Sequence, residues 1–178
     1  MRGEEKDGRV VIMVAWCRLV LLNRMLEEGN TVYRAGDLDT AAATYTAALD
    51  RMGGAGRGGA AWASLRTRLL LNLSRAQRRR GRTREAVAAA SEVLAADPEC
   101  AEALVTRAKA ARAGGLVAEA VEDYAAALRL QPTNQTVYLE FLKLREEMKI
   151  KSRKQAFLSR SCDSIAYIDD SETNCSSI

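Results

Sequence analysis

The sequence predicts an all-α fold in which three helix pairs stack into one domain. Aromatic residues make up only 5% of the chain, while much of the 48% of apolar residues is alanine. This composition favours closely packed helices over a β-sandwich. The chain has two prolines and no sustained alternation of apolar and polar residues, which leaves little room for a sheet. The third observation is an internal repeat, with units at residues 22–55, 67–100 and 101–134.

The repeat is defined by positions that hold the same kind of residue in each unit. The eighth position is small and the twentieth is alanine, namely Gly29, Ser74 and Ala108, then Ala41, Ala86 and Ala120. Small side chains at these positions allow two antiparallel helices to approach closely. The fifteenth position is glycine in each unit, namely Gly36, Gly81 and Gly115. A turn that needs a left-handed backbone conformation is predicted there.

This spacing resembles the tetratricopeptide repeat family, over about residues 22–134. The resemblance implies a right-handed superhelix of three helix-turn-helix repeats, in which the first helix of each unit lines a concave groove. The chain departs from the family where Glu28, Gln77 and Arg107 stand at positions that are usually large and apolar. We therefore expect looser packing around the first helices.

The N-terminal residues 1–21 contain a mostly apolar run, "VVIMVAWCRLVLLNRM", that continues into the first repeat. Arg18 interrupts this run, which is shorter than the ~20 residues that a membrane-spanning helix needs. No small-residue cleavage site follows it. We interpret the segment as a buried or docking helix, with a signal anchor as the alternative, and expect no membrane span.

Three further segments complete the predicted organisation. A glycine-rich insertion at 53–63 predicts a flexible loop and an N-terminally extended helix in the second unit. Over residues 135–152, apolar side chains recur every three or four residues, which predicts a helix that caps the open end of the stack. Residues 153–178 are rich in serine and aspartate, and we expect them to be disordered.

Placed on the family's template, the groove receives many basic and amide side chains. They are Asn30, Tyr33, Arg34, Arg68, Asn72, Arg75, Arg78, Arg79, Lys109 and Arg112. On this template only Glu102 opposes them. Crowded guanidinium groups repel one another, and an acidic or phosphorylated peptide would relieve that repulsion through charge-assisted hydrogen bonds. The alternative is that several of these arginines extend into water, or favour the negative helix end near Gly81.

Composition argues against other function classes. The chain has no histidine, and no set of nucleophile, base and orienting group can be assembled, so an enzyme is not expected. The four cysteines are too far apart for a zinc set, so we expect no metal and no cofactor, and reduced thiols in a cytoplasmic protein. Nucleic-acid binding is not expected, because Tyr33 is the one aromatic residue placed in the groove.

Two groups within the family are similar to parts of this chain. Co-chaperones that bind EEVD tails use a carboxylate clamp of two asparagines and three basic residues. Asn30 and Asn72 match the asparagines, whereas Leu26, Glu102 and Thr106 stand at the basic positions. This co-chaperone function is our alternative to a protein-binding adaptor.

The second group is the large tetratricopeptide, ankyrin and coiled-coil scaffolds. "NLSRAQRRRG", "EALVTRAKAAR" and "LQPTNQTV" resemble their later repeats and the exit into a final helix. That resemblance implies a cytoplasmic scaffold. Such scaffolds can end in a ligand for PDZ domains, and Ser176, Ser177 and Ile178 fit the pattern of that ligand. In this binding mode the segment would add a strand to the edge of the PDZ domain's sheet, with Ile178 in a pocket of that domain. The sequence does not assign an oligomeric state.

Overall fold

A computed structural model describes residues 2–53 and 59–172, and for residues 2–12 and 159–172 it describes the backbone alone. The described residues form helices and no strand, as predicted. The helices are α1 (Arg2–Ala35), α2 (Leu38–Met52), α3 (Ala60–Arg79), α4 (Thr83–Ala96), α5 (Ala101–Ala113), α6 (Val117–Leu130) and α7 (Gln135–Glu172).

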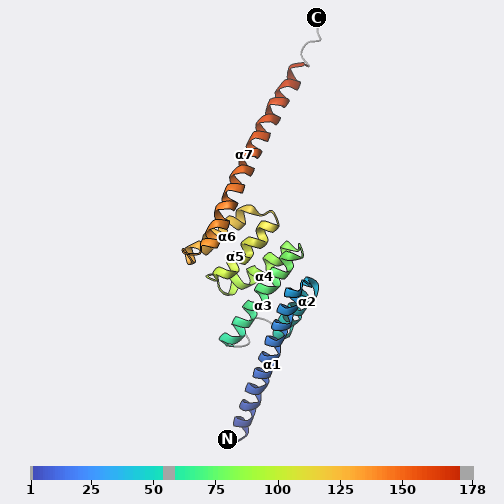
Figure 1. The fold of residues 1–178 in the computed structure, drawn as a ribbon, viewed down its shortest axis with the longest axis vertical. Helices are drawn as coiled ribbons and strands as arrows, with labels where there is room; N and C mark the ends of the chain where they lie inside the picture. The colour runs from blue at the N-terminus through green and yellow to red at the C-terminus, as the bar shows by residue number, and fades with distance from the viewer. Residues whose placement is uncertain (1, 54–58, 173–178) are drawn as a thin grey trace.

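Each helix packs against the next along the chain, so α1 and α2, α3 and α4, and α5 and α6 form three helix pairs. The first helices of neighbouring pairs also touch, α1 with α3 and α3 with α5. Helix α7 packs against α6 and covers the end of the stack. Figure 1 shows the result, a central stack from whose opposite ends α1 and α7 project.

The repeated small residues and glycines have the roles that their positions predict. A Cβ atom on Gly29 would lie 2.5 Å from the Cε1 atom of Tyr45, so the close contact between α1 and α2 requires glycine. In the second pair, the Ser74 hydroxyl donates a hydrogen bond of 2.7 Å to the carbonyl oxygen of Ala86. The turn glycines are left-handed, with φ of +92° at Gly36, +77° at Gly81 and +81° at Gly115.

The hydrophobic core runs through the stack as two clusters of buried side chains. One lies around Tyr45 and Leu26 in the first pair and extends to α3. The other lies around Tyr124 and joins the second and third pairs to α7 through Val137 and Leu144. The two tyrosines are each 1% exposed, so each core cluster contains one large, fully buried aromatic ring.

The polar residue Arg107 is packed tightly, which corrects the expectation of looser packing at this position. Its guanidinium donates from Nε and Nη2 to the two carboxylate oxygens of Asp123, at 2.8 and 2.6 Å. This bidentate hydrogen bonding raises the pKa of Arg107. The pairing of α5 with α6 therefore uses a partly buried ion pair where the family usually has an apolar contact. Glu28, by contrast, is exposed and pairs with Arg24 at 2.9 Å.

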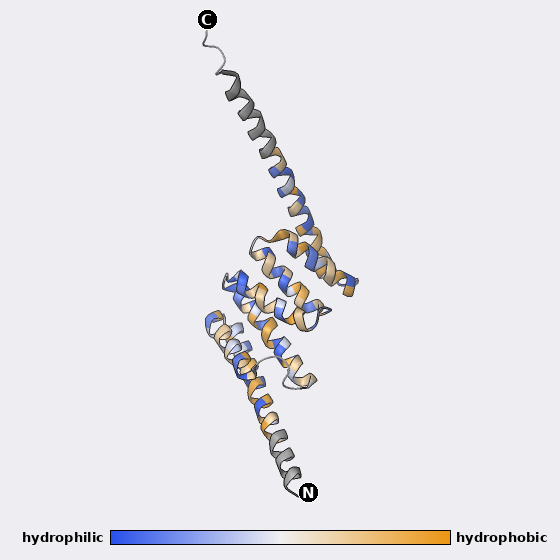
Figure 2. Cartoon of the chain, turned by 180° about the vertical axis from the view of Figure 1, so that it is seen from behind, coloured by the Kyte–Doolittle hydropathy of each residue, from blue (hydrophilic) through white to orange (hydrophobic). Residues whose placement is uncertain are grey.

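Helix α1 is continuous from the N-terminal segment into the first repeat, with no break near residue 21. Several of its apolar side chains are exposed instead of buried, namely Met13, Val14, Trp16, Val20 and Leu21. Figure 2 shows this apolar stretch in orange on the projecting part of α1. Arg18 ties the segment to α3 by lying 5.7 Å above the ring of Trp62. Among the described residues, no helix is both long and apolar enough to cross a membrane.

Helix α7 corrects the predicted boundary of disorder. Composition predicts disorder from residue 153, but the helix continues to Glu172. The physical reason is that the chain has no glycine or proline after Pro132, so no residue that breaks a helix interrupts the segment. Ser176, Ser177 and Ile178, the predicted PDZ ligand, lie outside the described residues, as does the part of the insertion at 54–58.

Candidate peptide-binding groove

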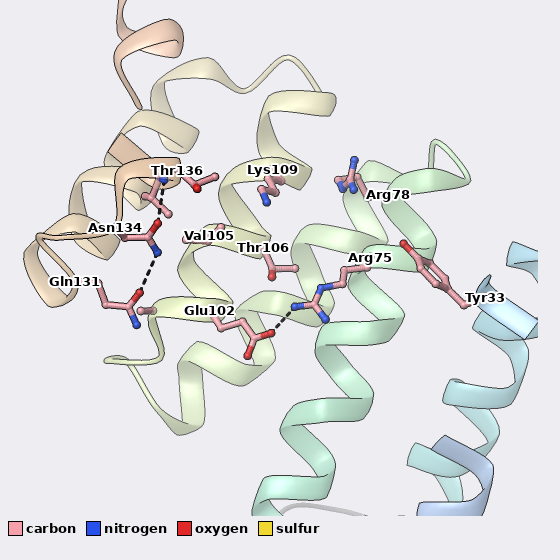
Figure 3. A pocket seen from close by; sticks show the side chains of 12 residues that line it. Tyr33, Arg75, Arg78, Glu102, Val105, Thr106, Lys109, Gln131, Asn134 and Thr136 are labelled. Carbon is pink, nitrogen blue, oxygen red and sulfur yellow. Dashed lines mark hydrogen bonds and ion pairs between the residues drawn. The ribbon is translucent and has the colours of Figure 1, made fainter. Parts of the chain in front are cut away.

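A cavity of about 450 Å³ opens between the first helices of the three pairs and the start of α7. We call it the groove cavity; Figure 3 shows it from close by. Its lining residues are Tyr33 from α1, Arg75 and Arg78 from α3, Ala101, Glu102, Val105, Thr106 and Lys109 from α5, and Gln131, Asn134, Thr136 and Val137 from the start of α7 and the segment before it. Three helix pairs and the capping helix thus all contribute to one hollow.

The basic side chains of the groove cavity differ in whether they have an ion-pair partner. Arg75 forms an ion pair with Glu102 and donates a hydrogen bond of 3.0 Å to the Oδ1 atom of Asn72. Arg78 and Lys109 lie on neighbouring helices, α3 and α5, and neither has an ion pair among the described residues. Two cations therefore remain available to a ligand in the cavity (Figure 3).

A second cavity of about 180 Å³ lies next to it and is lined by Asn30, Tyr33, Arg34, Tyr45, Asn72 and Arg75. The two asparagines are bonded to each other, since the Asn72 Nδ2 atom donates to Asn30 Oδ1 at 2.8 Å. The Tyr45 hydroxyl donates to the same oxygen at 2.9 Å. Burial, more than the nearby Tyr33 and Glu27, raises the pKa of Tyr45 to about 12. This polar network joins the first and second pairs.

Three predicted groove residues do not line either cavity. Arg68 lies 3.4 Å from a carboxylate oxygen of Glu27. Arg79 is exposed and its guanidinium carbon lies 4.9 Å from the centre of the Tyr33 ring, a cation–π contact. Arg112 is neutralised by two carboxylates of α7, those of Glu140 and Glu147.

The expectation that Glu102 alone opposes the groove cations is wrong. Arg112 donates to Glu140 at 2.8 Å and to Glu147 at 2.6 Å. Both glutamates are on α7, which the sequence placed at the end of the stack without fixing which of its faces meets α5. Glu27 adds a further carboxylate beside Arg68. Among the cations that line the groove cavity, Arg78 and Lys109 are therefore the two that have no ion pair among the described residues.

Several lining residues were missed from the sequence. Gln131, Asn134 and Thr136 come from the connection before α7 and from its first turn. Asn134 begins the helix, since its Oδ1 atom accepts a hydrogen bond of 3.2 Å from the backbone N–H of Val137. The sequence signal for this role was an asparagine just before a predicted helix. Its position at the edge of the groove depends on how α7 docks.

The structure also shows what stands at the three positions where a carboxylate clamp has basic residues. Leu26 is 0% exposed and belongs to the core of the first pair, so its position does not open into the groove. Glu102 is exposed and engages Arg75, and Thr106 lies in the wall of the groove cavity and is 6% exposed. None of the three supplies a cation.

Comparison with known proteins relates the chain to one repeat family. The family model for "Tetratricopeptide repeat" matches residues 71–135. Among solved structures, the C-terminal repeat domain of a putative FK506-binding protein from Plasmodium falciparum superposes with a TM-score of 0.67 at 22% identity, over 77% of this chain and 93% of that one.

Two other similar structures carry chaperone peptides. The first repeat domain of Spaghetti (RPAP3), bound to the HSP90 peptide SRMEEVD, has a TM-score of 0.60 and 23% identity, over 72% of this chain and 93% of that one. The second repeat domain of human RPAP3, in complex with the HSP70 peptide SGPTIEEVD, has a TM-score of 0.58 and 22% identity, over 68% and 92%. At these sequence identities, the structural similarity establishes the fold alone.

Proposed function

Because the chain is a tetratricopeptide repeat protein, we propose that it is a non-enzymatic adaptor that holds an acidic or phosphorylated peptide segment in the groove cavity. The observation that carries the proposal is the pair of cations, Arg78 and Lys109, that line the cavity without an ion pair among the described residues. Each is a donor at a site of positive potential, and an anionic ligand would satisfy both.

The other lining residues favour an extended peptide over a small anion. Val105 and Val137 offer apolar surface beside the cations, and Gln131 and Asn134 offer amide groups at the edge. Amide side chains can donate to and accept from a peptide backbone, while the valines contact aliphatic side chains. A segment in which acidic and aliphatic residues alternate fits this combination of groups.

The test is a binding measurement on the whole chain. Fluorescence anisotropy would compare labelled peptides that contain aspartate or phosphoserine beside valine with neutral counterparts of the same length. We expect Arg78→Glu combined with Lys109→Glu to abolish binding of the acidic peptides and to leave helicity unchanged. The matched control is Arg84→Glu combined with Arg129→Glu, the same charge change on exposed residues of α4 and α6. Equal losses in both variants would mean that only net charge matters, and would overturn the proposal.

The second candidate function is a co-chaperone that binds EEVD-type tails through a degenerate clamp. It is favoured by Asn30 and Asn72, whose side chains lie together at the junction of the first two pairs. Two structures with the same fold hold peptides of this type. The missing cations at Leu26, Glu102 and Thr106 weigh against it.

The setting that we propose for the adaptor follows from the sequence resemblance to large tetratricopeptide, ankyrin and coiled-coil scaffolds. It is a cytoplasmic scaffold, in which the groove holds one protein. The PDZ-ligand role of Ser176, Ser177 and Ile178 stays a prediction from sequence.

A further inference from the structure

Helix α7 is apolar on two opposite faces, and one of them is uncovered. Phe141, Leu144 and Met148 pack onto the core of the stack. About half a turn away, at roughly 100° per residue, runs a second apolar set. Its members and their exposed fractions are Leu139 (56%), Leu142 (38%), Ile150 (45%) and Phe157 (70%). One face anchors the helix to the stack, and the other is exposed to solvent. This exposed face begins where α7 packs on the stack and continues onto the part of the helix that projects from it (Figure 1).

Two charged residues continue this second face between the apolar ones. Glu146 follows Leu142 by one turn, and Arg153 follows Ile150 by a little less than one turn. Both are exposed. From Leu139 to Phe157 the set therefore recurs at steps of three, four, four, three and four residues, a pattern close to the helical period that keeps one face straight along the axis. We call these six residues the outer stripe of α7.

The order of charges in the outer stripe specifies how a second stripe would pair with it. In an antiparallel pair of two α7 helices, Leu142 of one copy lies opposite Phe157 of the other, and Glu146 lies opposite Arg153. The two Ile150 side chains then meet beside the two-fold axis. In a parallel pair, Glu146 would face Glu146 and Arg153 would face Arg153, which is repulsive. Charge complementarity thus favours a second copy of α7 as the partner of the outer stripe, in the antiparallel orientation.

We propose that two copies of this protein associate through the outer stripes of their α7 helices, antiparallel and about a two-fold axis. The contact is isologous, so each copy supplies the same surface and the assembly closes as a dimer. The paired segment from Leu142 to Phe157 is about 22 Å long at the rise of an α-helix.

The arrangement avoids the rest of the molecule. The inner face of α7, with Leu144 at 0% exposure, is the one that packs on the stack, so a partner helix on the outer stripe approaches from the opposite side. The antiparallel order places the two stacks at opposite ends of the paired helices. A dimer of this kind would present two groove cavities, so a target with two acidic segments would be bound with greater avidity than a target with one.

Charge reversal on the full-length chain tests the proposal. Sedimentation velocity from low to high micromolar concentrations should show the wild type passing from monomer to dimer. Glu146→Arg alone and Arg153→Glu alone each create two like-charge contacts per dimer, and each should weaken dimerisation by about tenfold or more. The double variant E146R/R153E restores opposite charges and should recover the dimer. An equimolar mixture of the two single variants should form heterodimers.

Matched controls separate this contact from a general effect of charge. Lys151→Glu makes the same charge change as Arg153→Glu but on another face of α7. Glu122→Arg makes the same charge change as Glu146→Arg but on α6, and both control residues are exposed. Neither should alter dimerisation, and circular dichroism should show equal helicity in all variants. A wild type that stays monomeric throughout would overturn the proposal. So would a dimer that the single reversals leave intact, such as one formed by the exposed apolar side chains of α1, or a double variant that fails to recover.

Discussion

The Arg75 guanidinium is held by the Glu102 carboxylate, which reaches it from the first helix of the next repeat. The ion pair lies in the wall of the groove cavity, beside Arg78 and Lys109, which have no ion pair within the described part of the chain. Glu102 therefore neutralises Arg75, a cation that an acidic ligand would otherwise contact. At the same time it holds the first helices of the second and third pairs in register. In this groove an internal carboxylate competes with the ligand.

Removing that competitor should strengthen binding. Glu102→Gln keeps the size of the side chain but frees Arg75, and we expect the affinity for an acidic peptide to rise by about fivefold. Because the glutamate side chain is 61% exposed, loss of this pair should change the free energy of unfolding by less than about 1 kcal/mol. Isothermal titration calorimetry checks the first expectation and urea unfolding the second. Glu119→Gln, an exposed change on α6, is the control, and an equal gain in that variant would contradict the role given to Glu102.

A peptide ending in EEVD separates the adaptor from the co-chaperone. We expect the free-acid and C-terminally amidated forms to bind the wild type within about twofold of each other, since the clamp positions supply no cation for the terminal carboxylate. Glu102→Lys restores one cation, and the free acid should then bind about tenfold more tightly than the amide. Anisotropy titrations measure both. Strong preference of the wild type for the free acid would favour the co-chaperone instead.

Much of this fold could be predicted because its determinants are local and repeated. The small residue at Gly29 and the turn glycine at Gly36 each act within one helix pair, so their spacing reports directly on packing. Arg107 shows where this reasoning fails. Its partner, Asp123, lies on the next helix, and no rule of spacing indicates that two polar residues will satisfy each other at an apolar position. The polar composition of the C-terminal segment predicts disorder and so does not predict the extent of α7, although the segment has no helix breaker.

The candidate site could be predicted in part for the same reason. Tyr33, Arg75, Arg78 and Lys109 line the groove cavity, and each lies on a first helix whose inward positions follow from the repeat. The sequence could not show which cations are already neutralised. That depends on side chains from other elements, as with Arg112, which is paired with two glutamates of α7. Tertiary docking of the capping helix therefore decides where positive charge remains.

The partly buried pair of Arg107 and Asp123 should be a main source of stability between α5 and α6. Asp123→Asn leaves the guanidinium partly buried without a counter-charge, and we expect a loss of about 2 to 4 kcal/mol in the free energy of unfolding. Chemical denaturation monitored by circular dichroism measures this loss. Glu28→Gln removes an exposed pair with Arg24 and should cost less than about 0.5 kcal/mol. Similar losses in the two variants would show that burial of the first pair has no energetic consequence.

Replacing each of the two buried tyrosines by phenylalanine should have a different effect on stability at neutral pH. The Tyr45 hydroxyl donates to Asn30 at 2.9 Å, so Tyr45→Phe loses a hydrogen bond and should destabilise the protein by about 1 kcal/mol. The Tyr124 hydroxyl is buried and has no hydrogen-bond partner among the described residues. Tyr124→Phe removes an unsatisfied polar group and should be neutral, or stabilising by up to about 1 kcal/mol. Thermal or urea unfolding distinguishes these results, and equal losses would contradict the difference in bonding.

At alkaline pH, ionisation of either buried tyrosine should lower the stability of the folded protein. Burial raises the pKa of Tyr45 from its ordinary value of 10.0 to about 12, and it also raises the pKa of Tyr124. Below pH 10 both rings are neutral in the folded and unfolded chain, so stability is unaffected by their ionisation. As pH rises from 10 toward 12, the unfolded chain loses these protons first, and stability falls. The comparison is with each phenylalanine variant, in which the fall in stability between pH 10 and 12 should be smaller than in the wild type.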